Sequence, residues 1–326
     1  MIGGAVDELL PMLLAQIPDT RRKQLEVWVQ DAPALYRVSS SNYSDADGFW
    51  AEGPGRIHLR ASAENLRRTL AHELVHASLG ASWQALPGTI EEGLCDVISA
   101  QLCPEGSAHM RGGRLLSAGF ATGGVPLELE IVVPADIHPL GIRATLNTRL
   151  RLEGDPPMRL DPLEVFRVQA GLSSTTVASE VKKACYGLGF LVVERILDRH
   201  GIEGLHALCK RARDEERARI PEQWLLEAAE LTPEPAVWQQ AAIAALGPAE
   251  LEELVRAHPE FLLRTLTSFC SAWPDPAALE AALPRMHARI RLPGGTASLS
   301  LLDMPEIRER LARNWVADAL PLSSRP

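Results

Sequence analysis

Residues 69–77 read TLAHELVHA and contain the pattern His-Glu-x-x-His, which decides how the rest of the chain is interpreted. Ser62 is a residue type that caps helices and Gly80 can end one, so we predict a helix between them. Four residues of a helix turn through about 400°, so His72 and His76 project from one face, about 40° apart. Two imidazoles placed in this way can bind one metal ion.

Glu73 lies on the adjacent strip of this helix, where a carboxylate can bind and deprotonate a water molecule on the metal. The opposite side is apolar, which allows the helix to pack while the histidines face a cleft; it carries Leu66, Leu70, Leu74 and Ala77. The pattern arises by chance in about one such chain in fifty. The alternative, two solvated histidines on a helix, therefore requires a second observation.

Residues 91–96 read EEGLCD and supply that observation on a second predicted helix, which spans roughly residues 89–102. A catalytic zinc ion takes three protein ligands and leaves one position for water. Glu92 and Asp96 share a face, so Glu92 can bind the metal while Asp96 accepts a proton from a ligand imidazole. Glu91 is the alternative ligand. Glu92 also fits a capping box with Thr89, in which it would only close the helix start, and Asp96 could be a solvated carboxylate.

These two segments resemble the gluzincin metallopeptidases, the zincin branch that contains thermolysin and the aminopeptidase N type enzymes, and they are most similar to bacterial peptidase-MA-like proteins. In that family a helix similar to residues 69–77 is followed by a Pro-containing turn and an EGLAEY-like helix, and here residues 87–96 read PGTIEEGLCD. The resemblance implies zinc as the cofactor and three ligands: His72, His76 and Glu92. It also implies Glu73 as general base and Asp96 as the acid behind a zinc-bound histidine.

A third segment extends the resemblance, because such enzymes often have a tyrosine that opens a helix as Tyr-x-x-Gly and stabilises the oxyanion. Here Tyr186 precedes Gly187 and Gly189 at the start of an apolar helix that ends near His200. The alternative for Tyr186 is a core tyrosine. His200 could be a second oxyanion donor or a helix C-terminal histidine that interacts with the dipole.

The sequence departs from this family in three places. Cys95 stands where alanine is common, the tryptophan before the glutamate helix is replaced, and the Gly-x-Met-Glu-Asn exopeptidase motif is absent. We therefore expect an endopeptidase rather than an aminopeptidase. Its substrate would lie as an extended strand against a sheet edge, either near residues 48–51 or near residues 56–60.

We predict an α+β fold: a zincin-like catalytic domain with a small twisted sheet, the active-site helix and the glutamate helix, together with a β-rich insertion and a C-terminal all-helical domain. Residues 1–103 form the N-terminal part of the catalytic domain. Residues 104–172, with alternating Leu127, Leu129 and Ile131, form the insertion. Residues 173–215 complete the catalytic domain with Tyr186, and residues 216–326, rich in Ala, Leu and Glu, form the helical domain.

The composition of the chain limits its expected cellular location and the kinds of partner it can bind. The net charge of −9 over 326 residues argues against nucleic acid, which attracts basic proteins. No stretch approaches the ~20 apolar residues of a membrane helix. The N-terminus has no Lys or Arg before Arg21, so we expect no secretory signal, and five cysteines without a Cys-x-x-Cys pair favour the cytoplasm.

The sequence predicts a zinc-dependent endopeptidase of narrow specificity that acts on a peptide or protein substrate. Phosphate-binding, dinucleotide-binding and serine-hydrolase motifs are absent. The alternative is a zincin-fold module, inactive or latent, that acts in protein–protein recognition. Retention of both histidines, of Glu73 and of Glu92 favours the enzyme.

Overall fold

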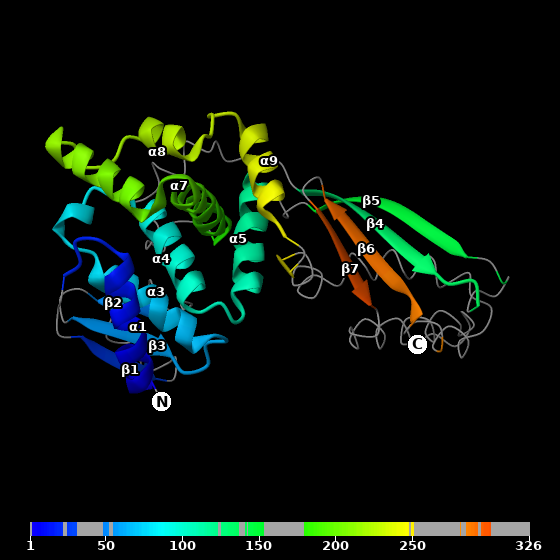
Figure 1. The fold of residues 1–326 in the computed structure, drawn as a ribbon, viewed down its shortest axis with the longest axis horizontal. Coiled ribbons are helices and arrows are strands. Elements are labelled where there is room, and N and C mark those ends of the chain that lie inside the picture. The colour runs from blue at the N-terminus through cyan, green and yellow to red at the C-terminus, as the bar shows by residue number, and fades with distance from the viewer. Residues whose placement is uncertain are drawn as a thin grey trace, which may run out of the picture. The chain divides into compact units, whose positions relative to one another are not determined.

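A computed structural model describes residues 2–21, 25–30, 48–51, 55–122, 125–136, 141, 143–152, 179–247, 249–250, 281, 285–292 and 295–300. The chain divides into two compact units (Figure 1). Unit 1 comprises residues 1–123 and 154–242, and unit 2 comprises residues 124–153 and 243–326. Helices and small sheets occur together, so the fold is α+β.

The sheet of unit 1 has three strands: β1 (Glu26–Gln30), β2 (Gly48–Ala51) and β3 (Arg56–Arg60). The central strand β3 pairs in parallel with β1 and antiparallel with β2. Ile57 and Leu59 of β3 are fully buried, as expected for a central strand. The strand predicted near residue 57 is confirmed, and its central place leaves β2 at one edge of the sheet and β1 at the other.

Helix α3 (Leu66–Ser78) contacts β2 and β3, and helix α1 (Ile2–Gln16) packs on α3 (Figure 1). The predicted helix with the His-Glu-x-x-His pattern is confirmed, but it begins later than predicted. Asn65, not Ser62, is the N-cap, because its side chain accepts a hydrogen bond from Arg68 N at 3.0 Å. A 3₁₀ turn, η2 (Ala81–Trp83), follows α3.

Unit 1 contains five further described helices, the first of which packs directly on α3. They are α4 (Gly88–Leu102), α5 (Ser107–Ala121), α7 (Ser179–Asp214), α8 (Glu222–Ala229) and α9 (Pro235–Ala245), the end of which is assigned to unit 2. Helix α4 packs between α3 and α7, and α5 packs on α7. Gly201, at φ 63°, interrupts α7 with a kink close to the predicted helix end.

Glycines allow α7 to approach its two neighbours closely. A Cβ atom on Gly189 would overlap the carbonyl oxygen of Thr89 in α4, and one on Gly93 would overlap that of Gly189. On the α5 side, a Cβ on Gly187 would lie 2.6 Å from the carbonyl oxygen of Arg114. The helix that carries Tyr186 is thus held against both α4 and α5.

Gly189→Ala is expected to lower the free energy of unfolding by about 1–3 kcal/mol, because the methyl group overpacks the crossing of α4 and α7. Gly113→Ala is the matched control: Gly113 is exposed in α5, and its Cβ would meet nothing within 4 Å. That variant should gain up to about 1 kcal/mol from helix propensity. Thermal unfolding followed by circular dichroism compares the two. A Gly189→Ala protein as stable as wild type would contradict the close crossing.

Unit 2 contains a four-stranded antiparallel sheet in the order β5-β4-β6-β7. Its strands are β4 (Val125–Val133), β5 (Ala144–Leu152), β6 (His287–Leu292) and β7 (Gly295–Ser300). Glu130 of β4 binds Arg289 at 3.2 Å and Arg291 at 3.1 Å across the β4–β6 pair. Opposite charges on neighbouring strands support this register.

Two predictions about the chain's organisation need correction. The segment 216–326 is not all-helical, because β6 and β7 lie in it; the alternation of His287, Arg289 and Arg291 with apolar residues favours a strand. The segment 104–172 is not uniformly β-rich, because it begins with α5, which belongs to unit 1. The strand indicated by the alternation of Leu127, Leu129 and Ile131 is confirmed as β4, and β5 pairs with it. Residues 153–178, 251–280 and 301–326 lie outside the described residues.

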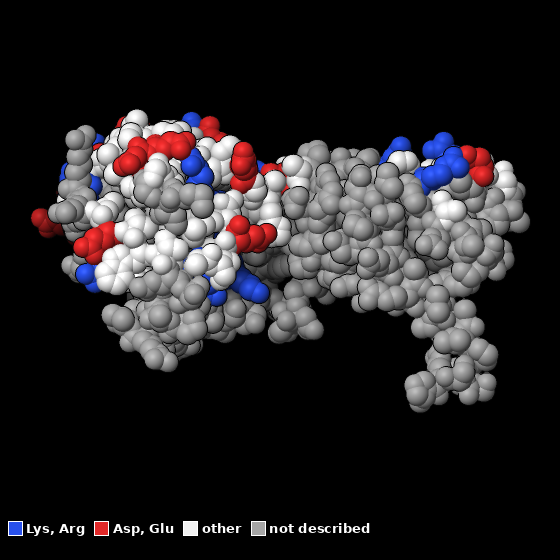
Figure 2. Space-filling view, turned by 90° about the horizontal axis from the view of Figure 1, so that it is seen from below, with Lys and Arg blue, Asp and Glu red and all other residues white. Residues whose placement is uncertain are grey.

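The described surface carries charges of both signs, interspersed on the face in Figure 2. The described residues of unit 1 on that face form no broad basic area of the kind that binds a phosphate backbone. Among the described helices, none combines the length and the apolar character needed to cross a bilayer.

Candidate metal centre

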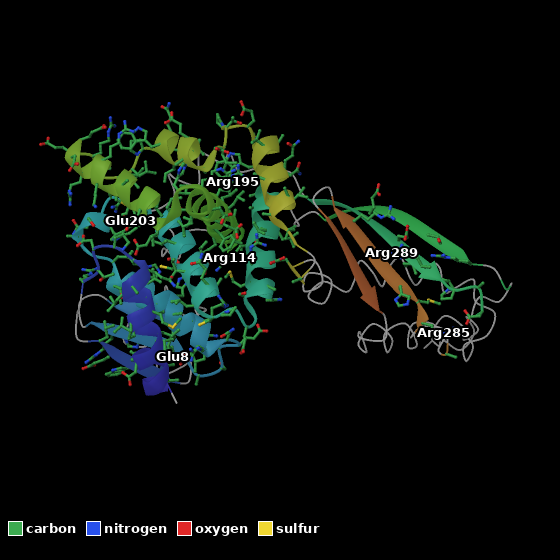
Figure 3. All side chains as sticks on the ribbon, in the orientation of Figure 1. Glu8, Arg114, Arg195, Glu203, Arg285 and Arg289 are labelled. Atoms are coloured by element: carbon green, nitrogen blue, oxygen red, sulfur yellow. The ribbon has the colours of Figure 1, made fainter. Side chains whose placement is uncertain are left out.

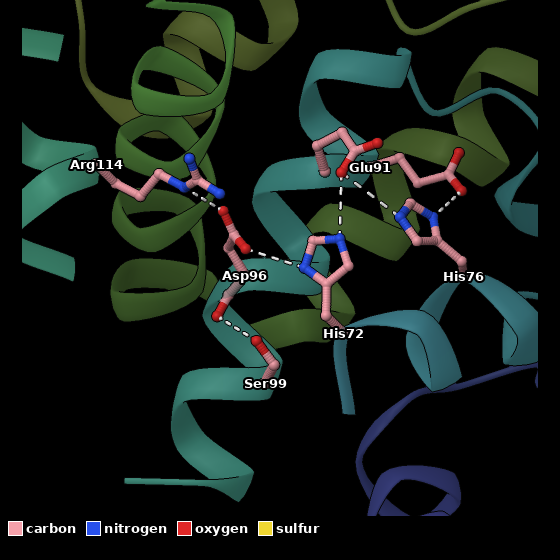
Figure 4. A network of polar contacts seen from close by, with 7 residues as sticks. His72, His76, Glu91, Asp96, Ser99 and Arg114 are labelled. Atoms are coloured by element: carbon pink, nitrogen blue, oxygen red, sulfur yellow. Dashed lines mark hydrogen bonds and ion pairs between the residues drawn. The ribbon is translucent and has the colours of Figure 1, made fainter. Parts of the chain in front are cut away.

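Helix α3 places His72 and His76 side by side on one face, as predicted (Figure 4). Their ring centroids are 5.1 Å apart and the rings meet edge to face. Buried residues between them, Leu74 and Val75, fix the helix against its neighbours. The two imidazoles are 12% and 14% exposed, so they are not the solvated histidines of the alternative interpretation.

Helix α4 brings one carboxylate oxygen to both histidines. Glu92 Oε2 lies 3.2 Å from His72 Nε2 and 3.5 Å from His76 Nε2. Ligand atoms bound at 2.0–2.1 Å to a tetrahedral zinc ion stand about 3.3 Å from one another. The two measured distances therefore match edges of such a tetrahedron.

The other nitrogen of each histidine is held by a second carboxylate. Asp96 Oδ1 lies 2.9 Å from His72 Nδ1, and Glu91 Oε1 lies 2.8 Å from His76 Nδ1. A carboxylate that accepts the Nδ1 proton fixes the tautomer and leaves the Nε2 lone pair free for a metal. Asp96 occupies the position predicted for it. Glu91, the alternative ligand in the sequence analysis, here contacts the outer nitrogen of His76.

The charges of the centre show that it attracts cations. Burial opposes the charged form of His72, yet hydrogen bonds to Asp96 and Glu92 raise its pKa to about 9. Burial likewise opposes the charged form of Glu92, but the charge of His76 and hydrogen bonds to both histidines hold its pKa well below the usual range. The raised pKa of His72 and the lowered pKa of Glu92 both favour a positive charge next to the carboxylate. A metal ion can supply that charge in place of protons.

Asp96 is tied to α5 by a residue that the sequence analysis missed. Arg114 Nε donates a hydrogen bond to Asp96 Oδ2 at 2.5 Å, and Ser99 Oγ donates to the Asp96 carbonyl oxygen (Figure 4). Burial would raise the pKa of Asp96, but the Arg114 charge and His72 lower it to about 2. Figure 3 shows Arg114 among α4, α5 and α7. Nothing in the local sequence marks it, because α5 lies outside the stretch that resembles the peptidases.

Tyr186 lies close to this group at the beginning of the well-packed part of α7. The Arg114 guanidinium stands over its ring, 4.6 Å from the centroid. The Glu92 charge and burial raise the pKa of the Tyr186 hydroxyl. Tyr186 therefore stays protonated and can donate a hydrogen bond. His200 is exposed beside the Gly201 kink, unlike the residues around the two histidines.

Glu73 is buried beside the ligand histidines. Burial raises the pKa of its carboxyl group, and the charges of His72 and His76 oppose that shift. A general base works best when its pKa approaches the working pH, and a raised carboxyl pKa moves Glu73 in that direction. The position and the environment of Glu73 both suit proton transfer.

Cys95 is the second residue that sequence reasoning left unused. His72, His76 and Cys95 form a group that could hold a metal ion, with one ligand atom of each lying within 4.8 Å of the others. Cys95 is fully buried and lies beside His76. Its spacing of four from Glu91 was the available signal, because that spacing places both residues on one side of α4.

Asp96→Asn is expected to weaken zinc binding by about 10–100-fold, since the amide is a poorer acceptor for His72 Nδ1–H and leaves the Arg114 charge unpaired. Competition with a chromogenic chelator measures the affinity. Asp198→Asn, an exposed change on α7, should leave the affinity unchanged. An Asp96→Asn protein with wild-type affinity would mean that Asp96 does not support the metal ligand.

Comparisons of the chain with protein-family models, with curated proteins and with solved structures give no match. The likeness to gluzincins stays a prediction from the motif residues. The donor set itself fits a divalent metal, because two imidazole nitrogens, a carboxylate and a thiol are all zinc ligands. The function of this chain is therefore inferred from the geometry of its own centre.

Proposed function

We propose that this protein is a zinc-dependent peptidase, an endopeptidase of narrow specificity for a peptide or protein substrate. One observation carries the proposal: Glu92 Oε2 lies within 3.2 and 3.5 Å of the two Nε2 atoms, and carboxylates hold both Nδ1 atoms from behind. Three converging donors with an open fourth position are typical of catalytic zinc sites. Imidazole and carboxylate ligands are compatible with zinc, which we take as the metal.

In this proposal His72, His76 and Glu92 hold the metal, and Asp96 and Glu91 orient the histidines. The bound metal supplies Lewis acidity, polarising a carbonyl group and lowering the pKa of a water ligand. Glu73 takes the proton of the attacking water and gives it to the leaving amine. Arg114 keeps Asp96 charged and holds the Tyr186 ring in place.

The substrate strand would pair with β2. Of the two strands that sequence analysis offered, β3 is central and already paired on both sides, whereas β2 is an edge strand that contacts α3. An edge strand offers backbone groups to an extended peptide. We also propose a cytoplasmic location, since the four cysteines in the described part of the chain are free thiols.

Tyr186→Phe is expected to lower kcat by about 100-fold, the effect of removing one oxyanion donor, while KM changes little. The loss falls on kcat because the hydroxyl would interact with charge that develops only in the transition state. Steady-state kinetics on a cleaved peptide separates the two constants. Tyr186→Phe removes one oxygen and leaves the ring under Arg114. An unchanged kcat would assign Tyr186 a packing role only.

The test of the proposed function is metal-dependent cleavage of a quenched-fluorescence peptide library by the full chain. We expect cleavage that is lost after chelation and returns when one equivalent of zinc is added. The product ends, identified by mass spectrometry, distinguish internal from terminal cleavage. The same assay is run on Cys95→Ala, which removes the buried thiol beside the histidines. If both wild type and this variant bind zinc but cleave no peptide, the recognition module is favoured over the peptidase.

A further inference from the structure

We infer that Cys95 is a fourth protein ligand that binds the metal reversibly, so that a closed, inactive form of the centre exchanges with the open form that cleaves peptide. The inference rests on the proposed metal site and adds its regulation. It starts from the position of Cys95 in α4. At about 100° per residue, Glu91 and Cys95 point about 40° apart, and so do Glu92 and Asp96. One side of α4 therefore presents four potential donors to the two histidines of α3.

The four donors are distributed over both histidines. Asp96 contacts His72, Glu91 contacts His76, Glu92 contacts both, and Cys95 lies in one group with the two rings. Of these four side chains, Asp96 and Glu91 are engaged with the outer Nδ1 nitrogens. Glu92 faces the two Nε2 atoms, which leaves the Cys95 thiol as the remaining side chain of the four. Cys95 is thus a fourth candidate donor beside the two histidines and Glu92.

The distances allow the thiol to join the ligand set. The ligand atoms of His72, His76 and Cys95 lie within 4.8 Å of one another. In a tetrahedral zinc site the nitrogen–sulfur edge is about 3.5 Å, so an approach of at most about 1.3 Å brings the sulfur to binding distance of a metal held by the two histidines. A rotation about the Cα–Cβ bond of cysteine moves its sulfur by more than this. Because Cys95 is fully buried, no water molecule competes for its sulfur from outside.

A fourth protein ligand changes what the centre can do. When the sulfur binds, the thiol proton goes to solvent and the water ligand leaves the fourth position. Zinc sites with four protein ligands are closed structural sites, whereas catalytic sites keep one open position. Glu73 then has no water to deprotonate. The closed form stores the metal, and movement of the sulfur away from it restores the open form.

Cobalt(II) in place of zinc tests this inference by absorption spectroscopy, without reference to activity. The full chain is stripped of metal, loaded with one equivalent of cobalt(II), and compared with Cys95→Ser and Cys95→Ala. We expect visible ligand-field bands in all three proteins and a near-ultraviolet thiolate-to-cobalt charge-transfer band in wild type alone. Cys185→Ser is the matched control, because Cys185 is an equally buried cysteine of α7 outside the metal group. It should keep the band.

A chelator competition gives a second readout: Cys95→Ala should bind zinc at least about tenfold more weakly, since even outer contacts are worth that much. Ligand-field bands without a charge-transfer band in wild type would overturn the role of Cys95 and leave the proposed peptidase intact. No cobalt bands in any protein would instead overturn the metal centre. If the Cys95 variants fail to fold, the wild-type and Cys185→Ser spectra decide the question, because only a bound thiolate produces that band.

Discussion

Replacing Glu73 with glutamine is expected to lower peptide cleavage by about 10²–10⁴-fold while the zinc content stays the same. Glutamine keeps the size and hydrogen-bonding groups of the side chain, but its amide cannot accept the water proton. Glu73 is buried against the histidines but is not one of the three proposed ligands. Its replacement should therefore leave the zinc affinity unchanged. The expected signature is therefore a loss of kcat in a fully loaded protein.

Glu64→Gln is the matched control for this change, since Glu64 is exposed just before α3 and undergoes the same chemical replacement. It should cleave peptide at the wild-type rate. Zinc content by plasma mass spectrometry and initial rates on one peptide are measured for all three proteins. Loss of zinc in Glu73→Gln would mean that Glu73 is a ligand. Full activity in that variant would remove Glu73 from the reaction.

His76→Ala and Glu92→Ala are each expected to abolish zinc binding at one equivalent, with affinities more than about 100-fold weaker, because outer contacts alone are worth about 10–100-fold. Each change removes one corner of the triangle formed by Glu92 Oε2 and the two Nε2 atoms. His76→Ala also leaves Glu91 without its histidine partner. The wild-type chain should carry about one zinc per molecule.

The control is His200→Ala, which replaces an exposed histidine on α7. This variant should retain zinc. The metal content of untagged protein is measured by plasma mass spectrometry after dialysis against a weak chelator. Zinc retained in Glu92→Ala would move the third ligand to Glu91 or Cys95. An absence of zinc from wild type, even after zinc is added back, would favour the recognition module.

Much of the centre could be predicted because its main elements are local. A spacing of four residues places His72 next to His76 and Glu92 next to Asp96 in any helix, whatever surrounds it. Strand β4 could also be predicted from a local pattern, because Leu127, Leu129 and Ile131 repeat with the two-residue period of a strand. The β6–β7 hairpin at residues 287–300 also shows alternation that favours strands. The Ala- and Leu-rich stretch before it favours helices, and the whole segment was therefore predicted to be helical.

The pairing of donors with histidines could not be predicted, since it depends on how α3 and α4 cross. Glu92 is the predicted third ligand and Glu91 the alternative, but spacing alone does not fix which of the two faces the histidines. In the structure, Glu92 faces both Nε2 atoms and Glu91 faces His76 Nδ1. One residue is about 100° on a helix, so the crossing geometry decides which of two neighbouring acids points inward.

The sequence by itself determined which residue types are available to the centre and which of them share a helix face, because the helical repeat is set by local backbone geometry. Only the tertiary structure decided that Arg114 joins it and lies over the ring of Tyr186, which the resemblance had already suggested. Arg114 on α5 reaches both Asp96 and Tyr186 where α5 and α7 pack closely at Gly187. Such contacts depend on shape complementarity between distant segments, which no local pattern encodes.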